Sequence, residues 1–336
     1  MSRRPDAPPV IRVHPAGASR QARRPSPWLA TAGVVAVVAA VAVARRTQVL
    51  VLVALFAVVV PFEKAWPRHP QRLRRPGLAT DLAYGMLQPL LRLATLVAAV
   101  VVGAASLVWI PGLLLRPLVA TLPYPVKVGV GVVAFDLAAY WVHRWNHQVP
   151  WLWRFHAVHH SSTRLDWISG IRNHPLDGVL IGPPALLLVA AGFSARVTGA
   201  LAVVEVLVGV FLHANVRWRL RPLQRLVATP EFHHWHHANE PHALDTNFAA
   251  LLPVWDLLFG TYRVPADARP SVYGTDRAVP ATLLGQLRDP LRNGRSRRDV
   301  VRHPRAALRR LARDLRRGLR QVARASRRPR PGGAAP

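Results

Sequence analysis

The stretch VKVGVGVVAFDLAAYWVHRWNH, residues 126–147, decides the fold because an apolar segment runs directly into two histidines. Its first part carries only Lys127 and Asp136 as charged residues, so we expect a membrane span over residues 126–141. His143 and His147 are four residues apart. If the helix continues past the span, both imidazoles lie on one face and can approach one metal ion. The sequence therefore predicts a metal-binding helix end at the edge of a membrane.

Two further histidine motifs have the spacing of a single helical face. The sequence HAVHH occupies residues 156–160 and HHWHH occupies residues 233–237, where the spacing leaves His234 on another side of the helix. One tetrahedral zinc ion takes four ligands, and a catalytic one usually takes three. Eight imidazoles therefore fit two metal ions, and imidazole suits Fe, Zn, Cu and Ni alike. The expected ligands are His143, His147, His156, His159, His160, His233, His236 and His237.

The composition is that of a helical membrane protein. Hydrophobic residues make up 51% of the 336 residues, yet Lys and Arg number 45 against 16 Asp and Glu. Membrane proteins combine apolar spans in lipid with basic flanks on the cytoplasmic side. The chain has no cysteine, which excludes disulfides, cysteine-based zinc sites, iron–sulfur clusters and thiol catalysis. We expect an all-α, polytopic membrane protein with a histidine-rich dimetal site on the cytoplasmic side.

Uncharged runs define the expected spans. Residues 1–27 form a basic leader that we expect to be disordered. A cleavable signal peptide is an alternative for the first uncharged run, since Ala42-Val43-Ala44 resembles a cleavage site. The expected spans are 28–44 and 47–60, which make up an N-terminal pair within 28–62, followed by 93–115, 126–141, 178–195 and 197–216.

The arginine distribution orients these spans. With the N-terminus in the cytoplasm, most Arg residues and all three histidine motifs fall on the cytoplasmic side. His174 precedes the hairpin of the last two spans and His213 ends it, so both lie at the depth of the motifs and are further ligand candidates. The protein is expected in a bacterial plasma membrane.

Few carboxylates lie near the histidines. Asp136 and Glu205 each precede a histidine by two helical turns, so either can accept an imidazole N–H or, alternatively, join two helices by a hydrogen bond. Asp245 is a further candidate partner of a ligand, and Asp166 and Asp177 are weaker ones.

The C-terminal part is strongly basic. Between Arg288 and Arg330 there are 17 Arg and 3 Asp, and five apolar residues from Leu308 to Val322 recur at helical spacing. A basic amphipathic helix on anionic lipid headgroups is expected within residues 270–336. No aromatic interleaving or fold motif indicates nucleic-acid binding, so no nucleic-acid partner is expected.

The motifs and their flanks resemble the fatty acid hydroxylase/sterol desaturase superfamily. The resemblance covers about residues 80–265, which we take as the catalytic domain, and motif order, spacing and flanks all agree with that superfamily. Phe248 departs from the pattern, because many relatives carry Tyr there. The segments that carry the resemblance are residues 135–147, 153–162, 229–237, 245–248 and 255–262.

The resemblance implies a helical membrane enzyme with a non-haem site of two iron ions. Such an enzyme uses O₂ to hydroxylate or desaturate a C–H bond of a lipid, such as a sterol or a fatty acyl chain. By residue, His143 and His147 fill the first motif of the superfamily and His174 and His213 occupy places of its additional histidines. The second motif is filled by His156, His159 and His160, and the third by His233, His236 and His237.

The sequence carries no flavin, haem or nicotinamide motif, so electrons are expected from a separate redox partner protein. Two other functions use the same histidines. One is a zinc-dependent hydrolase of a membrane substrate, and the other is a non-enzymatic metal-binding membrane protein, for instance a transporter. Transporters usually place their ligands near mid-membrane, whereas these histidines are expected at its edge.

Overall fold

The computed structural model describes residues 46–292, apart from 196–203, 205–206 and 222. Within these ranges the chain is helical and forms no β-strand, only the isolated bridges Pro67–Val216 and Ala238–Tyr273. The all-α class expected from the sequence is confirmed for this part of the chain. The α-helices are α2 (Arg46–Ala65), α3 (Leu78–Ala105), α4 (Trp109–Ala120), α5 (Tyr124–Gln148), α6 (Pro150–His159), α7 (Gly182–Ala190), α9 (Pro230–His236), α10 (Val254–Leu258) and α11 (Leu283–Arg292).

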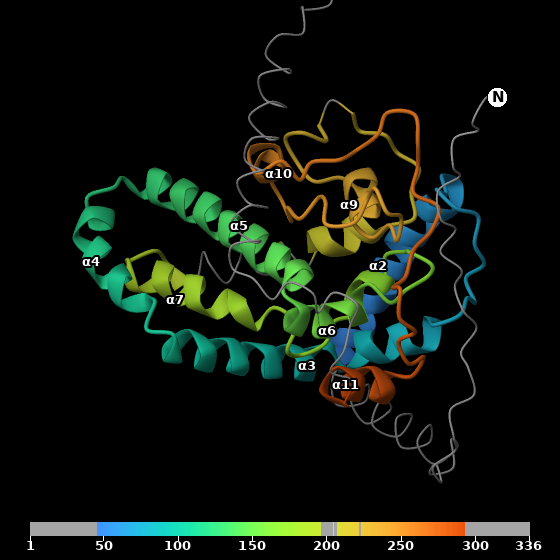
Figure 1. Cartoon of the computed structure of the whole chain (residues 1–336), viewed down its shortest axis with the longest axis horizontal. Helices are drawn as coiled ribbons and strands as arrows, with labels where there is room; N and C mark the ends of the chain where they lie inside the picture. Colours follow the sequence, from blue (N-terminus) through green and yellow to red (C-terminus); the bar gives the residue numbers. More distant parts are fainter. Residues whose placement is uncertain (1–45, 196–203, 205–206, 222, 293–336) are drawn as a thin grey trace, which may run out of the picture.

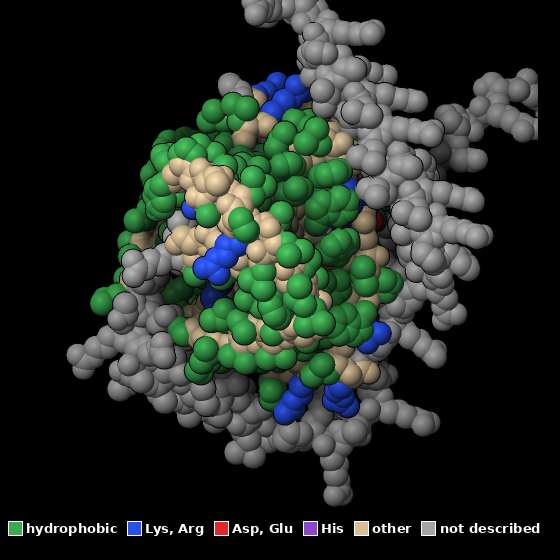
Figure 2. Space-filling model, turned by 90° about the vertical axis from the view of Figure 1, so that its left-hand side faces the viewer, with side chains coloured by type: hydrophobic (Ala, Val, Ile, Leu, Met, Phe, Trp, Pro, Cys, Tyr) green, Lys and Arg blue, Asp and Glu red, His purple; other side chains and the backbone are tan. Residues whose placement is uncertain are grey.

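Helices α3, α4, α5 and α7 form an elongated arm that extends away from the rest of the chain (Figure 1). With 28 and 25 residues, α3 and α5 are about 42 and 37 Å long. A bilayer's hydrocarbon core is about 30 Å thick, so both helices are long and apolar enough to cross a membrane. Only 17% and 28% of the residues in their most apolar windows are buried. Hydrophobic side chains accordingly dominate the face at the α4 end of the arm (Figure 2).

Small residues let α7 pack inside this arm. A Cβ atom on Gly182, the first residue of α7, would lie 1.8 Å from the carbonyl oxygen of Ala99 in α3. A Cβ on Gly103 would lie 2.7 Å from a methyl of Leu186. On α4, a Cβ at Gly112 would lie 2.4 Å from the carbonyl oxygen of Leu187. Close approach at small residues is the usual way in which membrane helices associate, because lipid offers no hydrophobic drive between them.

Proline sets two helix starts that orient the histidine motifs. Pro150 is the first residue of α6, and Val149 before it is extended, with φ −96° and ψ 115°. The residue before a proline avoids helical geometry, so the chain turns between α5 and α6 and brings the first two motifs face to face. Pro230 likewise begins α9 behind Thr229, whose hydroxyl accepts the Phe232 N–H.

The expected spans agree with the helices in part. The span 126–141 lies within α5 and 47–60 lies within α2, whereas 178–195 becomes the 3-10 turn Val179–Ile181 followed by α7. A single span over 93–115 is wrong. Helix α3 starts at Leu78, and Leu107 at φ 56° separates it from α4. Of the expected span 197–216, residues 204 and 207–213 are helical, whereas 197–203 and 205–206 lie outside the described residues, as do the leader 1–27, the run 28–44 and the amphipathic segment of the tail.

The described chain ends in α11, which lies beyond the expected catalytic domain but packs on it. Leu283 of α11 is buried with Tyr84 of α3 and Val158 of α6. The hydroxyl of Thr80 donates to the carbonyl of Ala281. These contacts fix the start of α3 against the helix that carries the second histidine motif.

Candidate metal centre

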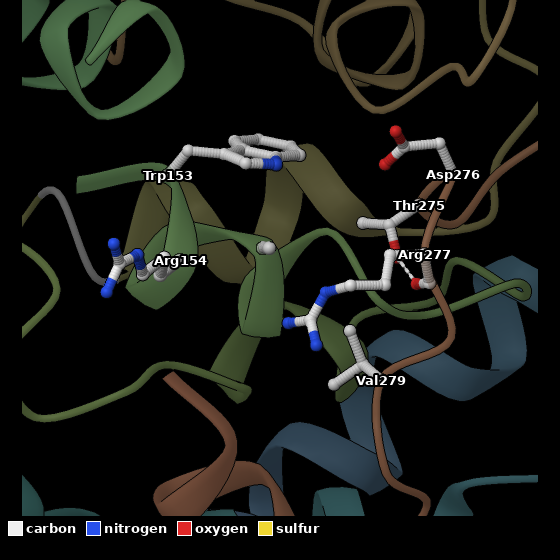
Figure 3. A pocket seen from close by; sticks show the side chains of 7 residues that line it. Trp153, Arg154, Thr275, Asp276, Arg277 and Val279 are labelled. Carbon is white, nitrogen blue, oxygen red and sulfur yellow. Dashed lines mark hydrogen bonds between the residues drawn. The ribbon is translucent and has the colours of Figure 1, made fainter. Parts of the chain in front are cut away.

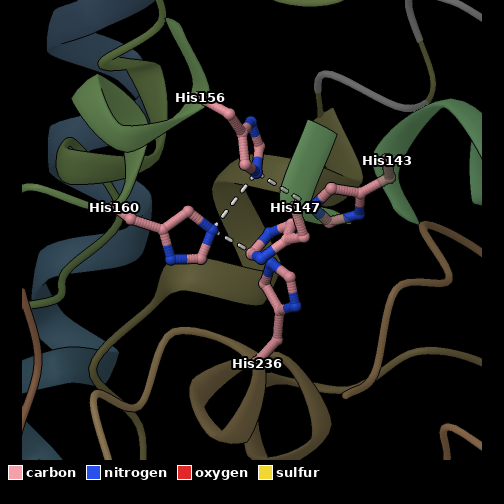
Figure 4. A group of neighbouring side chains, drawn as sticks. All are labelled: His143, His147, His156, His160 and His236. Atoms are coloured by element: carbon pink, nitrogen blue, oxygen red, sulfur yellow. Dashed lines mark hydrogen bonds between the residues drawn. The ribbon is translucent and has the colours of Figure 1, made fainter. Parts of the chain in front are cut away.

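Nine histidines from four segments form two separate groups. In each group the ring nitrogens that could bind metal all lie within 4.8 Å of one another. Figure 4 shows the rings of the first group turned toward a common centre. The first group is His143, His147, His156, His160 and His236, and the second group is His159, His213, His233 and His237. The second and third motifs each contribute to both groups, so α6 and α9 lie between the two centres.

Hydrogen bonds to the outer ring nitrogens fix the tautomers of the first group. His143 Nδ1 donates to the carbonyl oxygen of Phe248 at 2.7 Å, and His156 Nδ1 donates to the carboxylate of Asp177 at 2.9 Å. In the neutral rings Nε2 is then a bare lone pair in both. These two Nε2 atoms lie 3.2 Å apart, so neither can donate to the other. Two lone pairs at this distance repel unless a cation lies between them.

The second group has the same arrangement. His213 Nδ1 donates to the carbonyl of Gly209 at 2.6 Å, and His159 Nδ1 donates to the carbonyl of Arg172 at 3.1 Å. The two Nε2 atoms are 3.2 Å apart, and His213 Nε2 also lies 3.0 Å from His237 Nε2 and 3.1 Å from His233 Nε2.

These nitrogen spacings match metal coordination. Two imidazole nitrogens that bind one ion at about 2.0–2.1 Å and at right angles are separated by roughly 3 Å. The Nε2 atoms that face one another in both groups are 3.0–3.2 Å apart. The outer nitrogens of five of the nine rings donate to carbonyls or a carboxylate, as is usual for metal-bound histidine; these are His143, His156, His159, His213 and His236. The residues present therefore fit a metal ion in each group.

Burial keeps at least five of these imidazoles neutral. Of the nine histidines all but His143 are less than a tenth exposed. Burial lowers the pKa well below the ordinary value for His159 and His160 in the second motif, and the pKa falls in the same way for His233, His236 and His237 in the third. Each of these five rings is thus unprotonated at neutral pH and offers a lone pair without first losing a proton.

A loop after α9 supplies carbonyl acceptors for two ligands. The carbonyl of Thr246 accepts from His236 Nδ1 at 2.9 Å, and that of Phe248 accepts from His143. Asp245 and Asn247 both have φ 58°, a left-handed backbone that Asp and Asn tolerate better than most residues. The Asn247 amide donates to two backbone carbonyls and its oxygen accepts the Arg263 N–H at 2.7 Å, which locks the turn.

Asp256 on α10 holds the same loop by three hydrogen bonds. Its carboxylate accepts the N–H groups of Phe248 and Ala249 at 2.8 and 2.9 Å and the hydroxyl of Thr261 at 2.6 Å. Burial raises the pKa of Asp256 to about 6, against the lowering effect of these donors. Asp256 does not touch a ligand histidine. It positions the Phe248 carbonyl, and through that carbonyl it orients His143.

Glycine makes room for His213. Gly170 lies in the 3-10 turn Ser169–Ile171, and a Cβ there would lie 2.6 Å from His213 Nδ1 and 2.7 Å from Cγ. Such distances are shorter than real contacts, so only a residue without a side chain allows the backbone to lie against this ring.

Among the additional histidines, His213 joins the second group but His174 joins neither. Nδ1 of His174 accepts the Leu176 N–H at 3.0 Å, and Nε2 donates to the carbonyl of Leu287 at 3.1 Å. Both ring nitrogens are thus used, and the expectation that His174 binds metal is wrong. His234 points away from the groups, as expected, and bonds Tyr273 and the carbonyl of Ala214.

The carboxylates differ from expectation. Of the two roles considered for Asp136, the structure shows a hydrogen-bonded tie between separate segments and no imidazole partner among the described residues, because Asp136 accepts the N–H groups of Leu251 and Leu252 and the Trp255 indole. It thereby ties residues 251–255 to α5. Asp245 Oδ1 does lie 4.0 Å from His147 Nδ1. Asp177 is the carboxylate that touches a ligand directly, whereas Asp166 pairs with Arg75 and Glu205 lies outside the described residues.

Comparison with known proteins agrees with this geometry. Residues 128–261, which contain all nine clustered histidines, match the profile of the fatty acid hydroxylase family. An ornithine lipid hydroxylase from Rhizobium tropici is 30% identical over 255 residues, which are 74% of this chain and 75% of the relative. The chain belongs to the fatty acid hydroxylase family.

Other members of the fatty acid hydroxylase family match a shorter part of the chain. Alkylglycerol monooxygenase from Danio rerio is 30% identical over 43% of this chain and 32% of its own length. A Delta(7)-sterol-C5(6)-desaturase from Nicotiana tabacum is 30% identical over 44% of this chain and 54% of its own length. The relatives are thus oxidoreductases of lipids. No solved structure matches the chain significantly.

Proposed function

We propose that this protein is a non-haem diiron enzyme that uses O₂ to hydroxylate or desaturate a lipid. The observation that carries the proposal is the opposition of imidazole lone pairs in two buried groups, His143 against His156 and His159 against His213. A lipid hydroxylase, a monooxygenase and a desaturase among the relatives support oxidation rather than hydrolysis. Because the relative matched over most of its length is an ornithine lipid hydroxylase, ornithine lipid is the first substrate to test.

The chain's own residues hold the ions and exclude water. A bound pair of iron ions would supply the O₂ activation and the C–H cleavage that side-chain acids and bases cannot perform. The nine histidines would hold the two ions, one in each group. Carbonyls and Asp177 keep the proton of five ligand rings on Nδ1, so that Nε2 of each is free to bind. The buried ring of Phe248 lies 5.2 Å from the His147 ring and 5.9 Å from the His236 ring, measured between centroids, and closes one side of the first group.

In this proposal the end of the arm that carries the histidine groups lies at a membrane interface. Tyr124 at the start of α5 is 69% exposed and Trp145 near its end is 44% exposed. The helical rise places them about 31 Å apart, close to the hydrocarbon thickness, and both residue types favour membrane interfaces. The histidine groups lie at the Trp145 end. The arginine distribution favours the cytoplasm for that side, in a multi-pass arrangement from which a lipid reaches the ions laterally.

Lipid mass spectrometry tests the proposed reaction. Host cells that express the wild type should contain a lipid either one oxygen atom heavier or two hydrogen atoms lighter than its precursor, and cells with His159→Ala should not. A heavier product should take its oxygen from isotopically labelled O₂. An equal amount of product from the variant refutes the assignment of the site. Turnover of a lipid ester or amide without O₂ would instead establish a hydrolase.

A further inference from the structure

His213 is held in place differently from the other clustered histidines. Those eight lie on α5, α6 or α9, or directly follow α6 or α9. His213 instead ends the helical stretch 207–213, and the chain after it is not helical. Two residues later, Asn215 is only 2% exposed. Because buried polar groups must be paired, the hydrogen bonds of this asparagine fix the course of the chain as it leaves the ligand.

Asn215 gives every hydrogen-bonding group it has to the segment 63–69. Its backbone N–H donates to Glu63 Oε1 at 2.8 Å, and its carbonyl accepts the Arg68 N–H at 3.1 Å. Its side-chain oxygen accepts the His69 N–H at 3.0 Å, and its side-chain N–H donates to the His69 carbonyl at 2.8 Å. The backbone that follows the ligand is therefore built directly against the segment 63–69.

Glu63 also holds the turn that contacts the His213 ring. The same Oε1 atom accepts the Trp167 N–H at 2.9 Å. Three residues after Trp167 comes Gly170, whose backbone lies so close to the His213 ring that a Cβ would be 2.6 Å from Nδ1. Trp167 and Asn215 are at most 3% exposed, so water cannot take the place of the carboxylate oxygen. One oxygen atom thus fixes the chain on both sides of the ring.

We infer that Glu63 is a positioning residue for the second metal centre, which sets the place of His213 through the backbone of Asn215 and the turn that begins at Trp167. The inference rests on the proposed function, because it requires an ion in the second group. Glu63 belongs to neither group of candidate ligands. It also lies outside residues 128–261, which match the family profile, so a segment outside that match completes the centre.

The test measures ion binding in two backgrounds that isolate the groups. His147→Ala leaves a complete ligand set only in the second group, and His237→Ala leaves one only in the first. Protein in lipid nanodiscs is loaded with Fe²⁺ without O₂, and its metal content is measured against graded concentrations of a chelator. In the His147→Ala background, Glu63→Ala should raise the dissociation constant of the remaining ion about 10–100-fold. In the His237→Ala background it should leave that constant unchanged, which a general loss of stability would not do.

Glu63→Gln separates the hydrogen-bond acceptor from the charge. The amide oxygen can accept both N–H groups in place of Oε1, so the second ion should bind as tightly as it does with Glu63. An equal loss in Glu63→Gln and Glu63→Ala would overturn the inference, because the charge and not the held backbone would then matter. If Glu63→Ala does not fold, Asn215→Ala decides in the same backgrounds, since it removes two hydrogen bonds to His69. Selective weakening of the second ion supports the inference, and wild-type binding refutes it.

Two control variants each remove one hydrogen bond from a side chain to a backbone carbonyl. Lys64→Ala, beside Glu63 on α2, removes the bond of Nζ to the Gln71 carbonyl at 2.6 Å. Thr275→Ala removes the bond of the hydroxyl to the Arg277 carbonyl, also at 2.6 Å, in a surface hollow beside α6 (Figure 3). Neither bond involves the backbone that Glu63 holds, so both variants should bind both ions with wild-type affinity.

The outcomes separate this inference from the proposed function. If Glu63→Ala keeps the second ion with unchanged affinity in the His147→Ala background, the positioning role is refuted although the two-ion site stands. If the His147→Ala background binds no ion while Glu63 is present, the two-ion site itself is refuted. If Glu63→Ala weakens the remaining ion equally in both backgrounds, Glu63 acts on the whole fold and the inference is overturned.

Discussion

Substitution of Gly170 by Ala tests whether the second histidine group depends on the backbone beside it. The new Cβ would lie 2.6 Å from His213 Nδ1, whereas ordinary contacts begin near 3.4 Å, so the ring or the turn must move by about 0.8 Å. Overpacking of this kind costs about 1–3 kcal/mol. His213 Nε2 lies within 3.0–3.2 Å of three other Nε2 atoms, so a movement of this size breaks the arrangement of the whole group.

The expected result is a selective loss of one metal ion. Disturbing groups that orient a ligand weakens metal binding by about 10–100-fold, so Gly170→Ala should raise the dissociation constant of the second ion by that factor. The first group should keep its ion, because the three atoms nearest to the new Cβ all belong to His213 of the second group. Metal content is measured after dialysis against graded concentrations of a chelator, with circular dichroism to verify that the helices persist.

A matched control lies one helical turn before His213. Gly209 gives its carbonyl to His213 Nδ1, but a Cβ on Gly209 would meet nothing within 4 Å. Gly209→Ala should therefore bind both ions as the wild type does. The reasoning is refuted if Gly170→Ala retains two ions with wild-type affinity, or if Gly209→Ala loses one to the same extent.

Three further predictions concern the first group, the arm and pH. Asp177→Ala removes the carboxylate from His156 Nδ1 and should weaken metal binding in the first group about 10–100-fold while the second group is unaffected, as metal titration can show. Gly182→Ala forces a Cβ against the Ala99 carbonyl and should lower the thermal unfolding temperature, with a cost of about 1–3 kcal/mol, whereas Gly129→Ala, which meets nothing within 4 Å, should not. Metal-free protein should lose stability below about pH 6.5, because unfolded histidines take up protons there while the folded histidines whose pKa is lowered, among them His159, His160, His233, His236 and His237, do not. Glu63 and Asp256, whose pKa values are raised to about 7 and about 6, oppose this trend but are outnumbered by the histidines. A denaturant titration that showed rising stability between about pH 6.5 and about pH 5 would contradict the account.

The histidine motifs were predictable because their spacing determines which residues share a helical face. Residues four apart on α5, and three and four apart on α6 and α9, share a helical face whatever the surroundings. The assignment of these histidines to two groups was not predictable. Neighbours His159 and His160 belong to different groups, which follows from the turn between α5 and α6 and from the approach of α9, and no local pattern encodes that approach.

The hydrogen bonds that hold the ligand rings could not be predicted from the sequence, for a different reason. Main-chain carbonyls of Thr246, Phe248 and Gly209 hold ligand rings, and a carbonyl has no signature in the sequence. Asp136 is a side chain whose position in the sequence suggested a contact that the structure does not show. Asp136 lies two turns before His143, but a carboxylate two turns away on the same helix cannot reach that ring, and it bonds Leu251 and Trp255 instead. The break of the expected span 93–115 at Leu107 likewise has no proline or glycine at that residue to signal it.

Counting metal ions in three matched proteins tests the central claim most directly. Each group is proposed to hold one ion, so well-folded wild-type protein should bind two ions per chain. His147→Ala removes a ligand only from the first group and His237→Ala only from the second, so each should bind one ion tightly. Fewer than one ion per chain in folded wild-type protein, or two tightly bound ions in both variants, would contradict the two-centre arrangement.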